Sequence, residues 1–289
     1  MFKNFLKENS HSSEISDNKI KLFLKKTIIS QIYTYIKKIF HKPKSQSNES
    51  QIINKLINEF NISNTFIEFG FSGWEFNCAE LAIDKGTKVL RWSGLLVDGD
   101  NYNKKIGNII FHKNIVIKSF WLSLDTLNCF FEFKKENKKI GILSLDIDGN
   151  EFWILEKLIT LRPDMIICEF NVALGLRTIT VPYDKEFDRT KKHETWLYHG
   201  LSITALNYIC NKNDYSLIAV SSNGVNAFFM RNDLLNPDSK ILTPEKAFKT
   251  LTYADGTTSD QDFERIKHLP FVDVTKTGIS HNSFGEIVT

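Results

Sequence analysis

The chain has 289 residues, enough for one large α/β domain with appendages or for two small domains. Its hydrophobic content of 42% and charged content of 25% are ordinary for a globular protein. Residues 1–50 carry ten Lys against four acids, so the leader is basic and the rest of the chain is mildly acidic. An acidic body argues against nucleic-acid binding, which needs clustered Lys or Arg.

The cysteines and the apolar segments exclude several other classes of protein. The cysteines lie far apart with no C-x-x-C pair, so neither a zinc site nor a disulfide framework is indicated. The N-terminus lacks an uninterrupted apolar stretch with a small-residue cleavage site, so we expect no secretory signal. No segment reaches the length of about 18 apolar residues that a membrane span needs. A reducing, cytoplasmic location fits this pattern best.

The leader combines apolar residues and lysines at helical spacing. Residues 18–40 therefore predict a basic amphipathic helix, which packs on the domain or a partner, or lies on a membrane surface. A polar, non-periodic linker follows around Pro43. We divide the chain into a leader with linker over residues 1–45, an α/β domain over residues 46–232, and a peripheral C-terminal tail over residues 233–289, where Pro, Thr, Asp and Gly dominate.

The domain begins with a pattern typical of a nucleotide-like site. Helical spacing over residues 51–61 precedes a β-rich run over residues 65–69, a turn over residues 70–73 and a helix over about residues 74–85. A strand, a glycine turn and a helix in this order present backbone N–H groups to such a ligand.

The next predicted strand, residues 94–98, ends in an acid. Asp98 at this position is well placed to accept hydrogen bonds from the hydroxyl groups of a ribose. The alternative is a polar β-turn, which the Asp98-Gly99 pair favours in any protein.

The most informative stretch is the apolar run over residues 140–145, which predicts a strand buried on both faces of a sheet. Asp146 and Asp148 follow at its carboxyl end, where open α/β sheets bind ligands. Asp148 alone could simply cap the next helix. With Glu151 and Glu169 close in the predicted fold, we expect a functional acid cluster and take Asp146 and Asp148 as catalytic candidates.

The remaining pattern completes an α/β fold. Further strands are expected over residues 115–120 and 165–170, with helical patterns between most of them, which indicates a mainly parallel, doubly wound Rossmann-like sheet. Residues 171–197 form a long loop of the kind that acts as a lid. A helix over residues 200–213 then leads to a C-terminal antiparallel hairpin, with strands over residues 215–220 and 225–230.

Two histidines flank the predicted lid. His193 and His199 are candidate general bases, because imidazole accepts a proton near neutral pH. A single loop histidine is more often merely solvated.

Four motifs carry a resemblance to a known family. They are Glu68-Phe69-Gly70 with Gly73-Trp74-Glu75-Phe76-Asn77, residues 94–99 (GLLVDG), residues 143–151 (LSLDIDGNE), and Arg162-Pro163 with Glu169-Phe170-Asn171. Over roughly residues 65–231 the chain resembles class I S-adenosylmethionine-dependent methyltransferases, and more narrowly the FkbM-like group. It departs from the pattern at Ser72, where a further glycine is expected, and at Phe76, which replaces a cysteine.

The resemblance implies a cofactor site and an acceptor class. Glu68 and the backbone of Gly70, Ser72 and Gly73 would hold the methionine end of S-adenosylmethionine, and Asp98 would hold its ribose, with Asp146 also beside the cofactor. Such enzymes commonly methylate a hydroxyl group of a sugar or another small molecule.

The resemblance also raises the question of a metal. Asp146, Glu169 and Asn171 look like the ligand set of magnesium-dependent O-methyltransferases, in which Mg²⁺ orients and acidifies the acceptor hydroxyl. The same side chains could instead contact the acceptor or cap helices without a metal, and both interpretations stay open.

Two other functional classes remain as alternatives. A nicotinamide-dependent oxidoreductase shares the strand, glycine turn and later acid, but residues 70–73 do not fit G-x-G-x-x-G. A non-catalytic binding protein could dock through the basic leader.

Overall fold

The computed structural model describes residues 43–83, 92–100, 103–104, 111, 113–127, 130 and 139–276. All of these belong to one compact unit that begins at Pro43. The amphipathic helix predicted for residues 18–40 lies outside them. None of the described helices has both the length and the apolar character that crossing a membrane requires.

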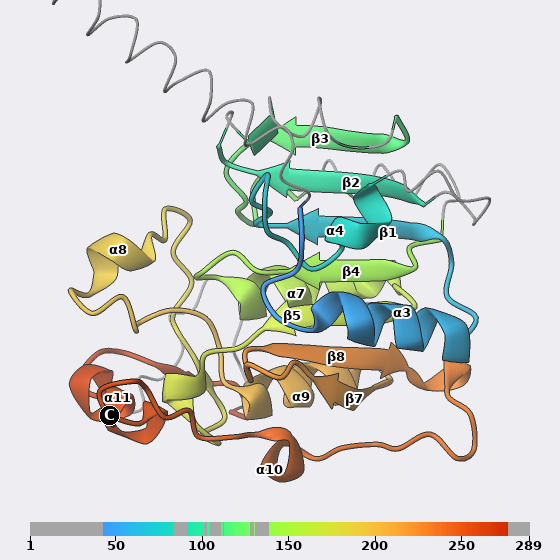
Figure 1. Cartoon of the computed structure of the whole chain (residues 1–289). Helices are drawn as coiled ribbons and strands as arrows, with labels where there is room; N and C mark the ends of the chain where they lie inside the picture. The colour runs from blue at the N-terminus through green and yellow to red at the C-terminus, as the bar shows by residue number, and fades with distance from the viewer. Residues whose placement is uncertain are drawn as a thin grey trace, which may run out of the picture. The chain divides into compact units, whose positions relative to one another are not determined.

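A seven-stranded sheet forms the centre of this unit, in the order β3-β2-β1-β4-β5-β8-β7 (Figure 1). Strands β1 to β5 run parallel, whereas β8 is antiparallel to both β5 and β7. The strands are β1 (Thr65–Phe69), β2 (Ser93–Asp98), β3 (Ile115–Ser119), β4 (Ile142–Leu145), β5 (Met165–Glu169), β7 (Tyr215–Val220) and β8 (Asn226–Arg231). This confirms the predicted fold class at the level of an α/β, Rossmann-like fold with a mainly parallel sheet and a C-terminal antiparallel hairpin.

Helices cover both faces of the sheet, as a doubly wound fold requires. Successive strand residues point to opposite faces, so Phe66 packs on one side with α3 (Glu49–Glu59) and α4 (Ala79–Ala82). Its neighbour Ile67 packs on the other side with α7 (Glu151–Leu158) and α9 (Ile203–Lys212). Burial on both faces explains the continuous apolar runs in the strands, because each buried Leu, Ile or Phe contributes about 1.5–3 kcal/mol.

The helix after β1 is shorter than predicted in its described part. Residues 71–78 form loop and turns, and α4 begins only at Ala79. The cause is Glu68, whose buried carboxylate accepts hydrogen bonds from the backbone N–H groups of Asn77 and Cys78. The chain is therefore wrapped around this carboxylate before the helix starts.

The long loop and the C-terminal segment hold more structure than their sequences indicate. The loop contains η2 (Val172–Leu174), β6 (Ile179–Thr180) and α8 (Arg189–Lys192), and β6 pairs with β9 (Val272–Asp273). The remaining elements are η1 (Ile159–Leu161), η3 (Asn232–Leu234), α10 (Pro244–Ala247) and α11 (Ser259–Ile266). The elements of two to four residues carry no recognisable periodicity, which is why the sequence does not predict them. The eight-residue α11 buries Ile266 but otherwise mainly polar side chains, so its apolar pattern is weak.

The C-terminal segment packs into the fold and does not merely cover it. Ile266 and Phe271 are fully buried in a small core with Leu174 and Tyr198. In Figure 1, α8 and α11 both lie on the side toward which the parallel strands point. The loop and the C-terminal segment together therefore border the carboxyl edge of the sheet, where the functional site was expected.

Candidate functional site

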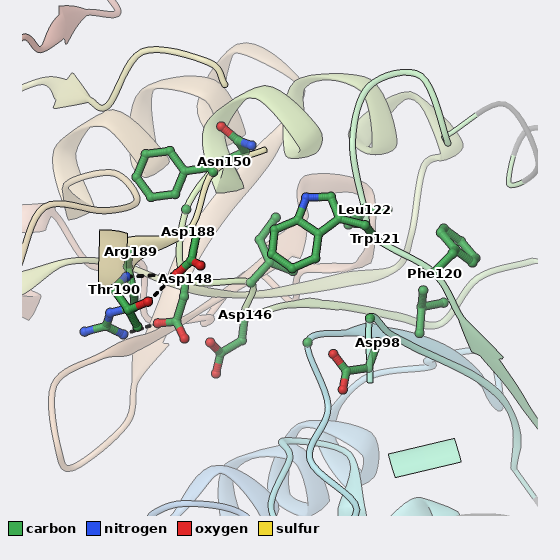
Figure 2. Close-up of a pocket in the computed structure, with 16 residues that line it drawn as sticks. Asp98, Phe120, Trp121, Leu122, Asp146, Asp148, Asn150, Asp188, Arg189 and Thr190 are labelled. Atoms are coloured by element: carbon green, nitrogen blue, oxygen red, sulfur yellow. Dashed lines mark hydrogen bonds and ion pairs between the residues drawn. The ribbon is translucent and has the colours of Figure 1, made fainter. Parts of the chain in front are cut away.

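A cavity of about 310 Å³ lies at the carboxyl ends of β1, β2 and β4 (Figure 2). This volume is at the lower end of the range for small-molecule sites. Its described lining residues come from these strand ends, from the segment after β3 and from the α8 region: Gly70, Val97, Asp98, Gly99, Phe120, Trp121, Leu122, Asp146, Ile147, Asp148, Gly149, Asn150, Phe187, Asp188, Arg189 and Thr190.

Gly70 sets the floor of the cavity. Its φ is +81°, and a Cβ at this position would lie 1.4 Å from the backbone oxygen of Asp146. The Gly70 N–H donates to Val97 O at 2.9 Å, so the turn fits closely between β2 and β4. Only glycine combines this backbone angle with so close an approach.

Asp98 lies where the sequence predicted it, at the end of β2 and in the cavity wall. The Asn103 amide donates both to the Asp98 carboxylate and to Phe71 O, and its oxygen accepts from Gly73 N at 3.0 Å. Asn103 thereby ties the acid to the glycine turn. In Figure 2, Asp98 and Asp146 both point toward the space below Trp121.

Trp121 forms part of the cavity wall after β3. Its ring lies against Gly99, where an added Cβ would be only 3.2 Å away. The indole N–H donates to Lys185 O at 3.0 Å, which links this wall to the loop that carries α8.

The turn between β4 and α7 holds Asp148 in a left-handed conformation, with φ of 56°. The Glu151 carboxylate accepts from Ile147 N at 3.1 Å and from Gly149 N at 3.0 Å. Glu151 therefore satisfies the backbone donors of this turn, while Asp148 pairs with Arg189. The helix-capping explanation for Asp148 does not apply, because the N-cap of α7 is Asn150.

The acids at this edge are strongly perturbed. Burial, together with the charges of Asp148 and Glu151, raises the pKa of Asp146 to about 8. Burial and the charge of Asp146 raise the pKa of Glu169 well above its usual range. Burial also raises the pKa of Glu151 to about 7, against the effect of its N–H donors. Asp146 and Glu169 form a partly buried carboxyl pair that retains a proton at neutral pH.

Glu68 lies outside the described lining of the cavity. It is 1% exposed, and its carboxylate accepts from Asn77 N at 2.7 Å, Cys78 N at 2.8 Å and Ser144 Oγ at 3.2 Å. Burial raises its pKa to about 7 despite these bonds. Glu68 thus holds the loop before α4, and its contact with the methionine end of a cofactor stays a prediction.

The predicted glycine turn contributes unequally to the site. Gly70 lines the cavity, whereas Ser72 and Gly73 are not among its described lining residues. Ser72 Oγ accepts from Trp74 N at 3.3 Å, and the Gly73 N–H is engaged by Asn103. These two residues shape the turn, and direct cofactor contact by them stays a prediction.

Asn171 does not fit the predicted metal set in this arrangement. Its amide nitrogen donates to Leu197 O at 2.7 Å and to His199 O at 2.9 Å. Its oxygen accepts from Ala173 N at 3.0 Å as the N-cap of η2. The side-chain oxygen and nitrogen of Asn171 therefore both form hydrogen bonds with backbone atoms. The other two residues of the predicted set, Asp146 and Glu169, do lie together at the sheet edge.

The two candidate histidines have different environments. His193 Nδ1 lies 2.7 Å from Thr195 Oγ1, and His193 is not among the described lining residues. His199 is 6% exposed, and a ring nitrogen lies within 4.8 Å of carboxylate oxygens of Asp148 and Glu169. Burial, and then Arg189, lower the pKa of His199 to about 3, so its ring is neutral at physiological pH.

The sequence did not reveal the contributions of the α8 region. Arg189 forms an ion pair with Asp148 and donates from Nε to Trp196 O at 3.1 Å. Asp188 caps α8 by accepting from Thr190 N at 3.0 Å. An acid immediately before Arg189 and Thr190 is an N-cap signal that could have located this helical turn within the loop.

The chain matches no protein-family model and no curated protein. Among solved structures it is similar to the apo structure of CalS11, a TDP-rhamnose 3′-O-methyltransferase of calicheamicin biosynthesis. The TM-score is 0.36 and the identity 9%, over 79% of this chain and 90% of that chain. Similarity at this level leaves the function to be inferred from the chemistry of the cavity.

Proposed function

We propose that this protein is an S-adenosylmethionine-dependent methyltransferase that methylates a hydroxyl group of a sugar or another small molecule. The observation that carries the proposal is the acidic lining of the cavity at the carboxyl edge of the sheet. Four carboxyl groups and one guanidinium group are among its described lining residues: Asp98, Asp146, Asp148, Asp188 and Arg189. S-adenosylmethionine carries a sulfonium and an ammonium group, and a cavity rich in carboxyl groups attracts cations.

The same features argue against a nicotinamide dinucleotide. Its pyrophosphate would need free N–H groups at the start of the helix after β1. Here the N–H groups of Asn77 and Cys78, just before α4, donate to Glu68. An anionic pyrophosphate would also be repelled by the acids that line the cavity.

The residues of the cavity suit the parts of the methyl donor. Asp98 would accept hydrogen bonds from the ribose hydroxyl groups, as acids at the end of a second strand do in related sheets. Trp121 and Phe120 offer aromatic surface to the adenine ring. The bare backbone at Gly70 permits close approach of the ligand. The cofactor would supply an electrophilic methyl group.

The chain itself would align the acceptor and remove its proton. We assign proton removal to the ionised form of Asp146, which with a pKa of about 8 is a stronger base than an ordinary carboxylate and becomes more populated as pH rises toward 8. Asp148 would act beside it, and His199, with its low pKa, is a weaker candidate base. Neither histidine is among the described lining residues, and His193 Nδ1 already lies 2.7 Å from Thr195 Oγ1. No step is assigned to Mg²⁺, since Asn171 does not fit the implied ligand set.

A second cavity provides room for the acceptor. It has a volume of about 790 Å³ and shares Phe187 with the first cavity. Tyr183 and Tyr198 line it together with Lys185 and Lys192. Aromatic faces and a few polar groups are a common lining for carbohydrate-sized ligands.

Calorimetry with Asp98 variants tests this proposal. The parent protein is expected to bind S-adenosylmethionine, and Asp98→Ala to lose about 1.5–3 kcal/mol of binding free energy, as for a hydrogen bond to a charged group. Asp100→Ala is the matched control, because Asp100 is an exposed acid outside the described lining. No binding by the parent, or equal affinity of the Asp98 and Asp100 variants, would reject the proposal.

A further inference from the structure

Three side chains from three different segments converge beside the first cavity. Asp148 follows β4, Glu169 ends β5, and His199 lies in the loop before α9. One ligand atom from each lies within 4.8 Å of the other two. Atoms that bind one ion at about 2.0–2.2 Å are separated by roughly 3 to 4.4 Å, so the three side chains lie near one another but would have to draw closer around an ion.

A second observation points to a ligand at this position. His199 is 6% exposed, and its Nδ1 is a buried atom without a hydrogen-bond partner. Buried polar atoms are normally paired in folded proteins, so an unpaired one needs an explanation. A ring nitrogen of His199 also lies within 4.8 Å of carboxylate oxygens of Asp148 and Glu169, and a cation could bind to all three side chains.

We propose that Asp148, Glu169 and His199 bind a divalent first-row transition-metal ion such as Mn²⁺. An imidazole nitrogen favours these ions, whereas Mg²⁺ prefers oxygen ligands in an octahedral set that keeps several waters. This ligand set differs from Asp146, Glu169 and Asn171, and it shares only Glu169 with them. The inference goes beyond the proposed function and does not depend on it, because metal binding is measured without a methyl donor.

Hydrogen bonds around two of the three ligands hold the backbone of His199 close to the turn that carries Asp148. Asn171 donates to His199 O at 2.9 Å, and the Asn171 N–H donates to Leu201 O at 2.8 Å. The Gly200 N–H donates to Gly149 O at 3.0 Å, which fastens the histidine segment to the turn that carries Asp148. Asn171 is therefore a positioning residue, and such outer contacts orient metal ligands.

An ion can reach the proposed site from solvent, and one neighbouring side chain would compete with that ion for a ligand. The Asp148 side chain is 49% exposed, so an ion can reach it from solvent. Arg189 forms an ion pair with the same carboxylate. A bound cation and the Arg189 guanidinium would compete for Asp148, so removal of the guanidinium should strengthen metal binding.

Electron paramagnetic resonance with Mn²⁺ tests the proposal on the full chain. The parent is expected to bind Mn²⁺, with electron spin-echo modulation from a coordinated imidazole nitrogen. His199→Asn should lose this nitrogen signal and weaken binding at least tenfold. Arg189→Gln should strengthen binding severalfold, and a large excess of Mg²⁺ should be needed to displace Mn²⁺. His193→Asn is the matched control and should change neither signal nor affinity.

Several results would overturn the assignment. No Mn²⁺ binding by the parent, or bound Mn²⁺ without nitrogen modulation, excludes His199 as a ligand. Weaker binding in Arg189→Gln contradicts the competition for Asp148. If His199→Asn does not fold, as circular dichroism would reveal, the nitrogen signal of the parent and the Arg189→Gln titration still decide. Failure to bind S-adenosylmethionine would be a separate result that concerns only the proposed function.

Discussion

Two acid sites at the same edge of the sheet differ in what surrounds them. Glu68, at the end region of β1, accepts hydrogen bonds from two backbone N–H groups and one hydroxyl group. Asp146, after β4, is surrounded by other acids, and the charges of Asp148 and Glu151 raise its pKa. Burial raises the pKa of both, to about 7 for Glu68 and about 8 for Asp146.

The difference separates a structural acid from a reactive one. A carboxylate with donors on both oxygens is fixed in place and stabilises the loop that supplies those donors. Carboxyl groups that mainly face one another retain a proton and can exchange it with a ligand. A raised pKa by itself therefore does not identify the functional acid, whereas its hydrogen-bond partners do.

The largest expected effect comes from Gly70, which lies between the two acid sites. Gly70→Ala would place a Cβ 1.4 Å from Asp146 O and should cost about 4 kcal/mol or more of unfolding free energy. Gly256 has almost the same φ, +82°, with no atom within 4 Å of an added Cβ. Gly256→Ala should therefore cost only about 1–2 kcal/mol, the intrinsic strain of a left-handed residue. Equal losses in urea denaturation would contradict the close approach at Gly70.

The next largest effect on stability is expected from a pair of variants that compares the two acid sites directly. Glu68→Gln would turn an amide NH₂ toward backbone donors and should destabilise the fold by about 1–3 kcal/mol. Glu169→Gln resembles the protonated acid already present at neutral pH, so it should change stability by less than about 0.5 kcal/mol. Chemical denaturation at pH 7 measures both variants. A larger loss in Glu169→Gln would reverse the roles assigned to the two sites.

The smallest effect is a pH dependence of stability. Glu68, Asp146 and Glu151 have raised pKa values in the folded state, about 7, 8 and 7, so the folded protein binds more protons than the unfolded chain. Their stabilising contribution is complete below the unfolded pKa values near 4 and is lost as pH rises toward 8. Raising the pH from 6.5 to 8.5 should lower stability by about 1 kcal/mol or more, or about 2–4 °C in Tm.

Variants identify the groups behind this dependence. Asp146→Asn should flatten the slope between pH 6.5 and 8.5, whereas Asp100→Asn should leave it unchanged. His199 acts in the opposite direction at lower pH, because its folded pKa of about 3 lies below the ordinary value of 6.5. Its contribution is lost as pH falls from about 6.5 toward 3, so His199→Asn should reduce the acid-side loss. An unchanged slope in Asp146→Asn would show that this residue is not the titrating group.

The strands and the acids at their ends could be predicted from the sequence. Continuous apolar runs place β1, β2 and β4 within two residues of their observed bounds. Asp98 and Asp146 follow two of these runs directly, so their position at the cavity depends only on the order of the strands. The domain division and the role of the basic leader stay predictions, since residues 1–42 lie outside the described chain.

The parts that depend on loop conformation could not be predicted. His199 reaches the acids because Asn171 and the turn at Gly149 hold its backbone, and no spacing in the sequence reveals those hydrogen bonds. Arg189 reaches Asp148 from a four-residue helix inside a long loop. The sequence left open whether Asn171 binds a metal or serves without one, and in the structure its oxygen makes a local N-cap contact with Ala173 N. Such short-range hydrogen bonds decide the orientation of a side chain after the fold has fixed its position.

The most direct test of the central claim is a titration of the parent protein with S-adenosylmethionine and, separately, with a nicotinamide dinucleotide. The acidic lining of the cavity predicts that the methyl donor binds. The backbone N–H groups before α4 already donate to Glu68, so no binding of the dinucleotide is expected under the same conditions. Isothermal calorimetry at low salt measures both ligands. Binding of the dinucleotide in preference to S-adenosylmethionine, or of neither ligand, would contradict the account.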